Sequence, residues 1–245
     1  MDSTIEQGRQ LLKSNWRRLE GRQSDQNRGI SIPEIQNPIP PDAVIVDLVP
    51  MEELPESKKT ICTALAERRS HRKFKGAAIS LAELSLLLWA TQGVRRATQH
   101  YSMRTVPSAG ARHSFETYLY CDRVGDLGKG LYRYMPIEHK LCEISRREDL
   151  ADRIDRGLHG QRWNSAVTFL WTVVPYRMEW RYSVVAHKLI ALDAGHLCQN
   201  LYLACSCIEC GTCALGAYDQ EMLDAVLGVD GNDEFVVYAA VAGKI

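Results

Sequence analysis

The sequence predicts a layered α+β domain preceded by an N-terminal arm. A long helical pattern spans residues 183–207, and short segments rich in β-branched and aromatic residues occur at 116–121, 166–174 and 235–241. Helical patterns are interleaved irregularly with these few strand segments, which is typical of an α+β domain. A chain of 245 residues can bury one sizeable core of this kind.

The arm is expected to occupy residues 1–57. Ser3 and Glu6 stand at capping-box positions, and apolar residues follow at roughly helical spacing, so we expect the chain to begin with a helix that ends near residue 21. The next thirty or so residues are polar and then Pro-rich, which disfavours regular helix and predicts an extended segment wrapped over a surface. Residues 44–48 could pair as a short strand.

The domain itself is expected to occupy residues 58–245 and to begin with two helices. Residues 58–69 predict a helix with a basic cluster at its end. Ser80 should cap the second helix with Glu83 at the capping-box position, and Gly93 should end it. The residues of this helix that we expect to face the core are Leu84, Leu87, Leu88 and Thr91.

Two further helices are expected in the second half of the domain. The pattern at 183–207 contains the small residues Ala191, Ala194 and Gly195, which would let another helix approach closely, so it is the candidate core of a dimer. Asp219 can cap a short helix that precedes the last strand.

Composition excludes several classes of partner. Thirty basic residues balance thirty acidic ones, so no global field favours nucleic acid or an anionic membrane. The longest apolar runs, 84–90 and 166–175, are shorter than the eighteen or so residues that a membrane span requires. The first residues lack the basic and apolar regions of a signal peptide, and we expect a cytoplasmic protein.

Five of the eight cysteines fall within one short stretch, at Cys198, Cys205, Cys207, Cys210 and Cys213. The spacing of the last three resembles part of an iron–sulfur ligand run. The first two lie on a helix that otherwise looks buried, where cysteine behaves as a small hydrophobic residue. We predict no metal site, and a redox-active pair within 198–213 is left open.

A basic cluster at the end of the first domain helix is the strongest candidate for a ligand site. Residues 67–74 hold three arginines, a lysine and a serine. Arginine presents a rigid fork of donors that matches phosphate oxygens, and a serine hydroxyl adds a neutral donor. The alternative is a solvated helix end whose cations complement the helix dipole.

Three further segments accompany this cluster in order along the chain. Residues 104–113 form a loop of small residues, 211–219 look like a second glycine-punctuated loop, and Lys244 adds a cation at the end of an apolar strand. Together these segments resemble the FMN-dependent nitroreductase family, and most closely its SagB-type dehydrogenase branch, which is related to azoline oxidases. The resemblance runs from 61 to 244. The supporting matches in register are 80–84, 88–93, 130–134 and 192–196.

The resemblance implies a homodimer with a central, mostly antiparallel sheet flanked by helices and with FMN at the subunit interface. The residues implied for the phosphate and ribityl end of FMN are Arg68, Arg69, Ser70, Arg72 and Lys244. Those implied to line the flavin from the partner subunit are Pro107, Ser108, Ala109 and Gly110. Those implied at the reactive edge of the ring, near N5, are Leu215 and Gly216.

On the substrate side, the resemblance directs attention to Arg181 and Tyr182. Similar azoline oxidases carry a Lys-Tyr pair there, whereas arginine hardly ever deprotonates and is a poor general base. Tyr182 could act as an acid or a hydrogen-bond donor. Of the histidines, we expect His196 to be a hydrogen-bonded core residue, and His113 is kept as a candidate substrate contact.

The function expected from these residues is hydride transfer through flavin N5 by a ping-pong mechanism. The glycines at 125, 128 and 130 do not form a dinucleotide-binding fingerprint, so NAD(P)H would act without a Rossmann domain. The preferred reaction is NAD(P)H-dependent reduction of a small-molecule acceptor. The alternatives are dehydrogenation of azolines in a modified peptide, a non-catalytic flavin-binding protein, and an iron–sulfur protein.

Overall fold

The computed structural model describes residues 3–54, 56–57 and 59–245. Within these residues, seven strands form one sheet in the order β1-β6-β5-β4-β7-β9-β8, and all neighbouring strands are antiparallel. The strands are β1 (Ile45–Asp47), β4 (Phe115–Cys121), β5 (Gly130–Met135), β6 (Lys140–Ser145), β7 (Val167–Val173), β8 (Cys210–Leu215) and β9 (Phe235–Lys244). A separate hairpin pairs β2 (Val94–Ala97) with β3 (Ser102–Arg104). The predicted α+β fold with an antiparallel central sheet is confirmed.

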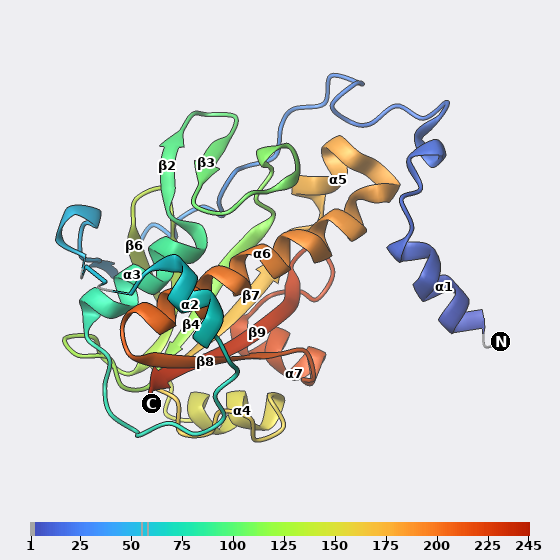
Figure 1. Ribbon diagram of the computed structural model, residues 1–245. Helices are drawn as coiled ribbons and strands as arrows, with labels where there is room; N and C mark the ends of the chain where they lie inside the picture. The colour runs from blue at the N-terminus through green and yellow to red at the C-terminus, as the bar shows by residue number, and fades with distance from the viewer. Residues whose placement is uncertain (1–2, 55, 58) are drawn as a thin grey trace.

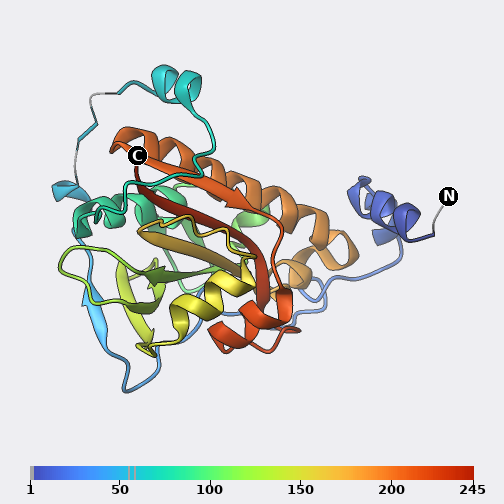
Figure 2. The same ribbon diagram turned by 90° about the horizontal axis from the view of Figure 1, so that it is seen from below.

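Helices cover both faces of this sheet, as Figure 1 and Figure 2 show. One face carries α3 (Leu81–Gln92) and the long helix α6 (Ala186–Cys207), with α2 (Ile61–Glu67) packed on α6. The opposite face carries α4 (Leu150–Gly157) and α7 (Gln220–Leu227). Helix α5 (Tyr176–Tyr182) follows β7, and α1 (Ser3–Leu12) lies in the arm. The short 3-10 turns are η1 (Trp16–Leu19), η2 (Met51–Glu53), η3 (Ala109–Ala111) and η4 (Ser183–Val185).

The two central strands, β4 and β7, are buried along their whole length because helices cover both of their faces. Leu119 and Phe169 pack into the core under α3 and α6, which we call the α6-side core. Their neighbours Tyr118 and Leu170 pack into the core under α4 and α7, the α4-side core. Burial on two sides therefore explains why exposed and buried residues do not alternate along these strands.

Local capping signals placed two helices as expected. Ser80 Oγ accepts from the Glu83 N–H at 3.1 Å, while the Ser80 N–H donates to the Glu83 carboxylate at 2.9 Å, and Gly93 follows the last turn of α3. Asp219 accepts from the Met222 N–H at 2.9 Å and caps α7. The predicted core residues of α3 are all buried, namely Leu84, Leu87, Leu88 and Thr91.

Three predicted segments differ in the structure. The arm helix ends at Leu12, and η1 replaces the rest of the expected helix. The described part of the 58–69 helix covers only Ile61–Glu67, because Arg68 already has extended backbone; Lys58 lies outside the described residues. Residues 210–215 form strand β8, not a loop, since full pairing with β9 outweighs the weak strand propensity of glycine and alanine.

The arm follows the expected extended course over the domain. Its strand β1 pairs with β6 and so extends the central sheet at one edge. Figure 1 shows α1 standing away from the sheet, with the following residues running toward α5. Among the described residues, no helix combines the length and the hydropathy that crossing a bilayer requires.

Candidate functional site

A basic cleft opens where α2 ends, beside the last turn of α6 and the start of β8. Its volume is about 660 Å³, which lies in the range of small-molecule sites. Arg68 and Arg69, both from the predicted phosphate cluster, line it. The other lining residues are Lys59, Glu67, His71, Lys75, Tyr202, Cys205, Ser206, Glu209, Cys210, Gly211, Thr212 and Ile245.

The charge around the cleft is mainly positive, although carboxylates are present. Lys59 Nζ pairs with the Glu67 carboxylate at 2.7 Å. The Arg68 guanidinium lies 5.3 Å from the centre of the Tyr202 ring, which orients it by a cation–π contact. Partial burial and then the nearby Arg69 charge lower the pKa of His71, so this imidazole is neutral at neutral pH.

The residues that follow Arg69 cover the open edge of the sheet. Ser70 forms a parallel bridge with Thr212, and the His71 N–H donates to the Thr212 carbonyl at 2.9 Å. The Ser70 and Tyr202 hydroxyls share a hydrogen bond of 2.8 Å, and Tyr202 Oη also accepts from the Ala214 N–H at 2.9 Å. Tyr202 therefore ties α6, β8 and the basic cluster together.

Arg72 and Lys244 have protein partners outside the lining of the cleft. The Arg72 guanidinium lies 5.9 Å from the centre of the Trp163 ring. Lys244 Nζ pairs with the Glu83 carboxylate and donates to the Ile208 carbonyl at 3.1 Å. The structure thus brings Arg68 and Arg69 together in the cleft, with Ser70, Arg72 and Lys244 on the neighbouring backbone, and the ligand roles of all five stay predictions.

Two observations concern the wall of the cleft. Thr212 Oγ1 is buried and has no hydrogen-bond partner within the described chain, so a donor is left over on the wall of the cleft. At Gly211 a Cβ atom would lie 2.6 Å from the His71 ring, so glycine is needed for the close approach of this segment to β8. A phosphate-bearing group would find two guanidinium groups and an unused hydroxyl here.

A second cluster forms where the 107–110 loop meets the end of α5. Gly110 has φ +58°, and a Cβ atom there would lie 2.6 Å from the Tyr182 hydroxyl and 3.0 Å from Arg181 Cδ. The Ala109 N–H donates to the Asp193 carboxylate at 3.2 Å, which fixes the loop on α6. The structure therefore brings together two predicted sets of residues, the loop and the Arg181–Tyr182 pair.

The buried position of Asp193 affects its ionisation. Burial raises the pKa of Asp193, and hydrogen bonds from Ser108 and Ala109 work against that rise. Ser108 Oγ also accepts from the His113 N–H at 2.9 Å. The loop is thus held through its two middle residues, Ser108 and Ala109, whereas its first residue, Pro107, is exposed.

The two clusters are separate within one chain. Asp193 anchors the loop and Tyr202 contacts the basic cluster, and these residues are nine positions apart on α6. A helix rises 1.5 Å per residue, so the anchors lie roughly 13 Å apart along its axis. Figure 1 shows the same arrangement, with α2 near one end of α6 and α5 near the other.

Leu215 is the last residue of the edge strand β8, and Gly216 follows it. The Leu215 side chain is buried in the α4-side core, so only its backbone is free to face a ligand. A Cβ atom at Gly216 would have no heavy atom within 4 Å, so space is open beside this residue. Their predicted place at the reactive edge of a flavin remains a prediction.

The prediction that His196 is a hydrogen-bonded core residue was wrong. Its side chain is 47% exposed, and its Nδ1 lies 3.7 Å from the Asp193 carboxylate. Position 196 falls on the outer face of α6, together with Leu192 and Gly195, which are also exposed. His113 is buried, and burial, with Arg104 as the next cause, lowers its pKa to about 3.

Cys198, Cys205 and Cys210 share the α6-side core, but the last three cysteines of the run do not gather at one place. Cys210 packs in the α6-side core and Cys213 in the α4-side core, because residues three apart on a strand point to opposite faces. Within the described ranges, no group of three His, Cys, Asp or Glu side chains could hold a metal ion. Burial raises the pKa of the Cys198 and Cys210 thiols to about 12, so neither is a ready thiolate.

Several residues at the cleft were not foreseen, chiefly Tyr202, Thr212 and Lys59. Tyr202 was predicted only as part of a helix. Thr212 lies at the cleft because it bridges Ser70, which is 142 residues away in the sequence. The one local signal for these residues was the glycine-containing segment at 211–213, which follows a helix predicted to be buried.

Comparison with known proteins bears on this arrangement. A family model described as the nitroreductase family matches residues 65–244, which include both clusters. The chain belongs to the nitroreductase family. Members of this family are oxidoreductases, so the protein is a nitroreductase-family oxidoreductase.

Individual nitroreductase relatives agree with this assignment. A protein of Methanocaldococcus jannaschii with a nitroreductase name is 31% identical over 160 residues, which cover 64% of this chain and 79% of that protein. A solved structure from Ralstonia eutropha, also named as a nitroreductase, is 26% identical with a TM-score of 0.62 and covers 87% of this chain and 98% of its own.

Two more distant structures share the nitroreductase fold. One, from Anabaena variabilis, has a TM-score of 0.69 at 24% identity over 83% of this chain, which spans only 42% of that longer protein. The other is the Escherichia coli microcin synthetase McbBCD complex with truncated pro-MccB17 bound. Its TM-score is 0.62 at 15% identity, with 80% of this chain and 77% of that chain covered.

Proposed function

We propose that this nitroreductase-family oxidoreductase uses FMN and belongs to the SagB-type dehydrogenase branch. The observation that carries the proposal is the cleft in which Arg68 and Arg69 stand beside the unpartnered hydroxyl of Thr212. Guanidinium groups and a free donor on one wall suit a phosphate monoester better than a neutral ligand. The family match over the same residues supports the choice of a flavin phosphate.

In this proposal Arg68 and Arg69 bind the phosphate of FMN. The ribityl chain of FMN then replaces the present partners of three side chains, those of Ser70, Arg72 and Lys244. Lys244 would leave Glu83, and Ser70 would share its hydroxyl between Tyr202 and the ligand. The backbone of Leu215 and Gly216, next to open space, would face the ring. When bound, the flavin supplies hydride transfer at N5.

We further propose that the protein works as a homodimer in which the 107–110 loop of one subunit completes the cleft of the other. The distance of roughly 13 Å along α6 between the two clusters favours this, because the loop stands well away from the basic cleft of its own chain. The exposed face of α6, with Leu192 52% exposed, offers an apolar surface for the partner. Tyr182 and Arg181 would then bound the substrate side of the partner's flavin.

The favoured reaction is NAD(P)H-dependent reduction of a small-molecule acceptor by a ping-pong mechanism. Donor and acceptor would use the same open face in turn. Arg181 would carry a fixed positive charge toward the substrate, and the Tyr182 hydroxyl would donate a hydrogen bond or a proton to it. Arg181 is a poor base, which argues against removal of a substrate proton at this position.

A second candidate is azoline dehydrogenation in a modified peptide. The specific observation in its favour is the fold similarity to the McbBCD complex, which was solved with a truncated pro-MccB17. In that reaction the substrate peptide, and not NAD(P)H, would supply the hydride.

The test is the visible spectrum of the purified protein followed by anaerobic titration with NADH and NADPH. We expect flavin absorption that bleaches on addition of one nucleotide and returns with a nitro or quinone acceptor. Flavin that persists with both nucleotides and bleaches with a thiazoline peptide would select the second candidate. Flavin that responds to no donor would indicate a non-catalytic binding protein, and iron without flavin would refute the proposal.

A further inference from the structure

The arm contacts helix α5 along most of the length of that helix. The Trp16 and Tyr182 rings meet edge to face, with centroids 5.9 Å apart. The Gln26 N–H donates to the Trp180 carbonyl, and Trp180 Nε1 donates to the Ile30 carbonyl, each at 2.9 Å. These contacts make the arm the neighbour of the helix that ends in the Arg181–Tyr182 pair.

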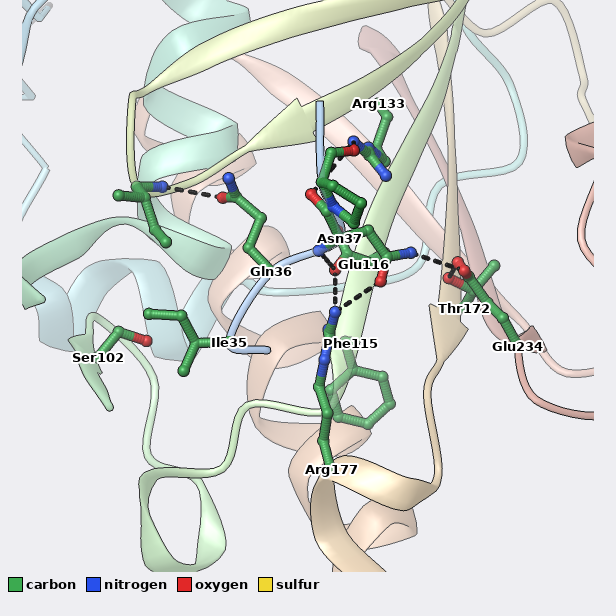
Figure 3. A network of polar contacts seen from close by, with 12 residues as sticks. Ile35, Gln36, Asn37, Ser102, Phe115, Glu116, Arg133, Thr172, Arg177 and Glu234 are labelled. Atoms are coloured by element: carbon green, nitrogen blue, oxygen red, sulfur yellow. Dashed lines mark hydrogen bonds and ion pairs between the residues drawn. The ribbon is translucent and has the colours of Figure 1, made fainter. Parts of the chain in front are cut away.

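The base of α5 is fixed to the arm by a buried polar network, which Figure 3 shows. Arg177 pairs with Glu116 of β4 at 2.7 Å, and the two side chains are only 3% and 2% exposed. Arg177 also donates to Asn37 Oδ1 at 2.7 Å, while the Asn37 N–H donates to the same Glu116 carboxylate at 2.7 Å. A buried ion pair is stabilised by hydrogen bonds from its surroundings, and Asn37 supplies one to each partner.

Asn37 also connects this network to the sheet. Its Nδ2 donates to the Glu234 carboxylate at 2.7 Å, and Glu234 precedes β9 and accepts from the Thr172 hydroxyl. The Asn37 carbonyl accepts from Arg133 of β5 at 3.3 Å. One residue of the arm therefore joins α5 to strands β4, β5 and β7.

The far end of α5 needs such support. Ser183, directly after Tyr182, has φ 46° and ψ −130°, a conformation that a residue with a Cβ atom rarely adopts. Strained backbone persists only where its surroundings hold it in place. Helix α5 has seven residues and is too short to be stable by itself, so packing must fix its direction.

We propose that the arm is a positioning element for Tyr182, with Asn37 fixing the base of α5 and Trp16 fixing its end. Trp16 holds the Tyr182 ring so that its hydroxyl lies beside Gly110 of the 107–110 loop. Asn37 acts through Arg177 and does not touch the substrate side. The catalytic part of this inference rests on the proposed function, whereas the positioning part does not.

The experiment compares hydrogen exchange of the full chain carrying Trp16→Ala, Trp16→Phe or Leu12→Ala. Trp16→Phe keeps an aromatic edge against Tyr182, and Leu12→Ala removes an apolar side chain that is 71% exposed on the same arm. We expect Trp16→Ala to speed exchange at least threefold in the α5 peptide that covers 176–183, with α3 unchanged. The Phe and Leu12 variants should match the parent protein.

Asn37→Ala should speed exchange throughout α5, and if that variant does not fold, the Trp16 series decides. On the flavin-loaded protein, Trp16→Ala should lower kcat with the acceptor at least fivefold while flavin content stays the same, and Trp16→Phe should restore it. Unchanged exchange at α5 in Trp16→Ala overturns the inference, and faster exchange with an unchanged kcat overturns its catalytic part. If the parent protein has no flavin chemistry, the proposed function fails and the exchange data alone decide the role of the arm.

Discussion

His113 is buried in the loop before β4, where its neighbours make a charged imidazole unfavourable. Burial, with Arg104 as the next cause, lowers its pKa to about 3, compared with an ordinary value of 6.5. The folded protein thus keeps His113 neutral down to low pH, while the unfolded chain binds a proton there below pH 6.5. Stability from this residue is complete above pH 6.5 and is lost progressively as the pH falls toward 3.

We therefore predict that His113→Asn makes stability less dependent on pH. Asparagine tolerates the positive φ of 45° at this position and has no proton to bind in this range. Between pH 7 and 5 the parent protein should lose about 2 kcal/mol more unfolding free energy than the variant, at roughly 1.4 kcal/mol per pH unit below 6.5. Urea unfolding at both pH values measures this difference. His100→Asn, at an exposed histidine, is the control, and equal pH slopes for parent and His113→Asn would contradict the assignment.

At the level of single residues, the sequence predicted which residue types suit a ligand better than it predicted where each side chain lies in the fold. Arg68 and Arg69 were recognised because arginines followed by serine at a helix end suit phosphate, and they do line the cleft. His196 was misplaced because its face on α6 depends on which side meets the sheet. Tyr202 was missed because its partners, Ser70 and Ala214, come from distant segments.

The end of α2 is the element on which the proposed phosphate site depends. The helix stops at Glu67, and Arg68 turns into extended backbone that runs beside β8. This change of direction places consecutive arginines on the wall of one cleft. A continued helix would have separated Arg68 and Arg69 by about 100° around its axis.

We predict that Arg68→Ala combined with Arg69→Ala lowers the flavin content of the purified protein at least tenfold. Each hydrogen bond to a charged group contributes about 1.5–3 kcal/mol, so losing two should weaken retention by at least that factor. The ratio of flavin absorbance to protein absorbance measures the effect. Arg146→Ala combined with Arg147→Ala is the matched control, because it removes an exposed arginine pair on the β6–α4 loop. Flavin content that is equal in both double variants would refute the proposed binding of the flavin phosphate by Arg68 and Arg69.

Elements with complete local signals were predicted well, and the others were not. Helix α3 has a capping box and a glycine stop, so both of its ends were predicted correctly. Strand β8 was interpreted as a loop because its glycine and alanine residues have low strand propensity, and only its pairing with β9 makes it a strand. Strands β5 and β6 were missed as elements because Arg133 and Glu143 interrupt their apolar pattern.

At the scale of the whole molecule, the two residue clusters at opposite parts of α6 favour a site built from two subunits. The basic cleft and the 107–110 loop stand apart in one chain, and the resemblance that predicted an interface flavin required such a division. Sequence alone gave the layered fold class, but the strand order β7-β9-β8 requires long-range pairing that no local pattern encodes.

We predict that two variants defective in different halves of the site restore flavin binding when they are mixed. Arg68→Ala with Arg69→Ala removes the cleft cations, and Gly110→Val disturbs the loop, because a Cβ atom there lies 2.6 Å from the Tyr182 hydroxyl. A dimer with one chain of each kind would have one intact site. Random exchange of subunits should then restore roughly a quarter of the parent flavin content. The chains are unfolded together, refolded with FMN and desalted before the measurement. A mixture that retains no more flavin than the separate variants would contradict a shared site.

The order of strands at one edge of the sheet also bears on how the protein is made by the ribosome. Strand β9 lies between β7 and β8, although β8 precedes it in the chain by about twenty residues. Among the strands in the described part of the chain, only β9 pairs with β8, so β8 must wait during translation until β9 has been synthesised. A nascent chain that has reached α7 therefore carries β8 without its strand partner. We expect this to be the stage at which the growing polypeptide is most open to chaperones and to aggregation.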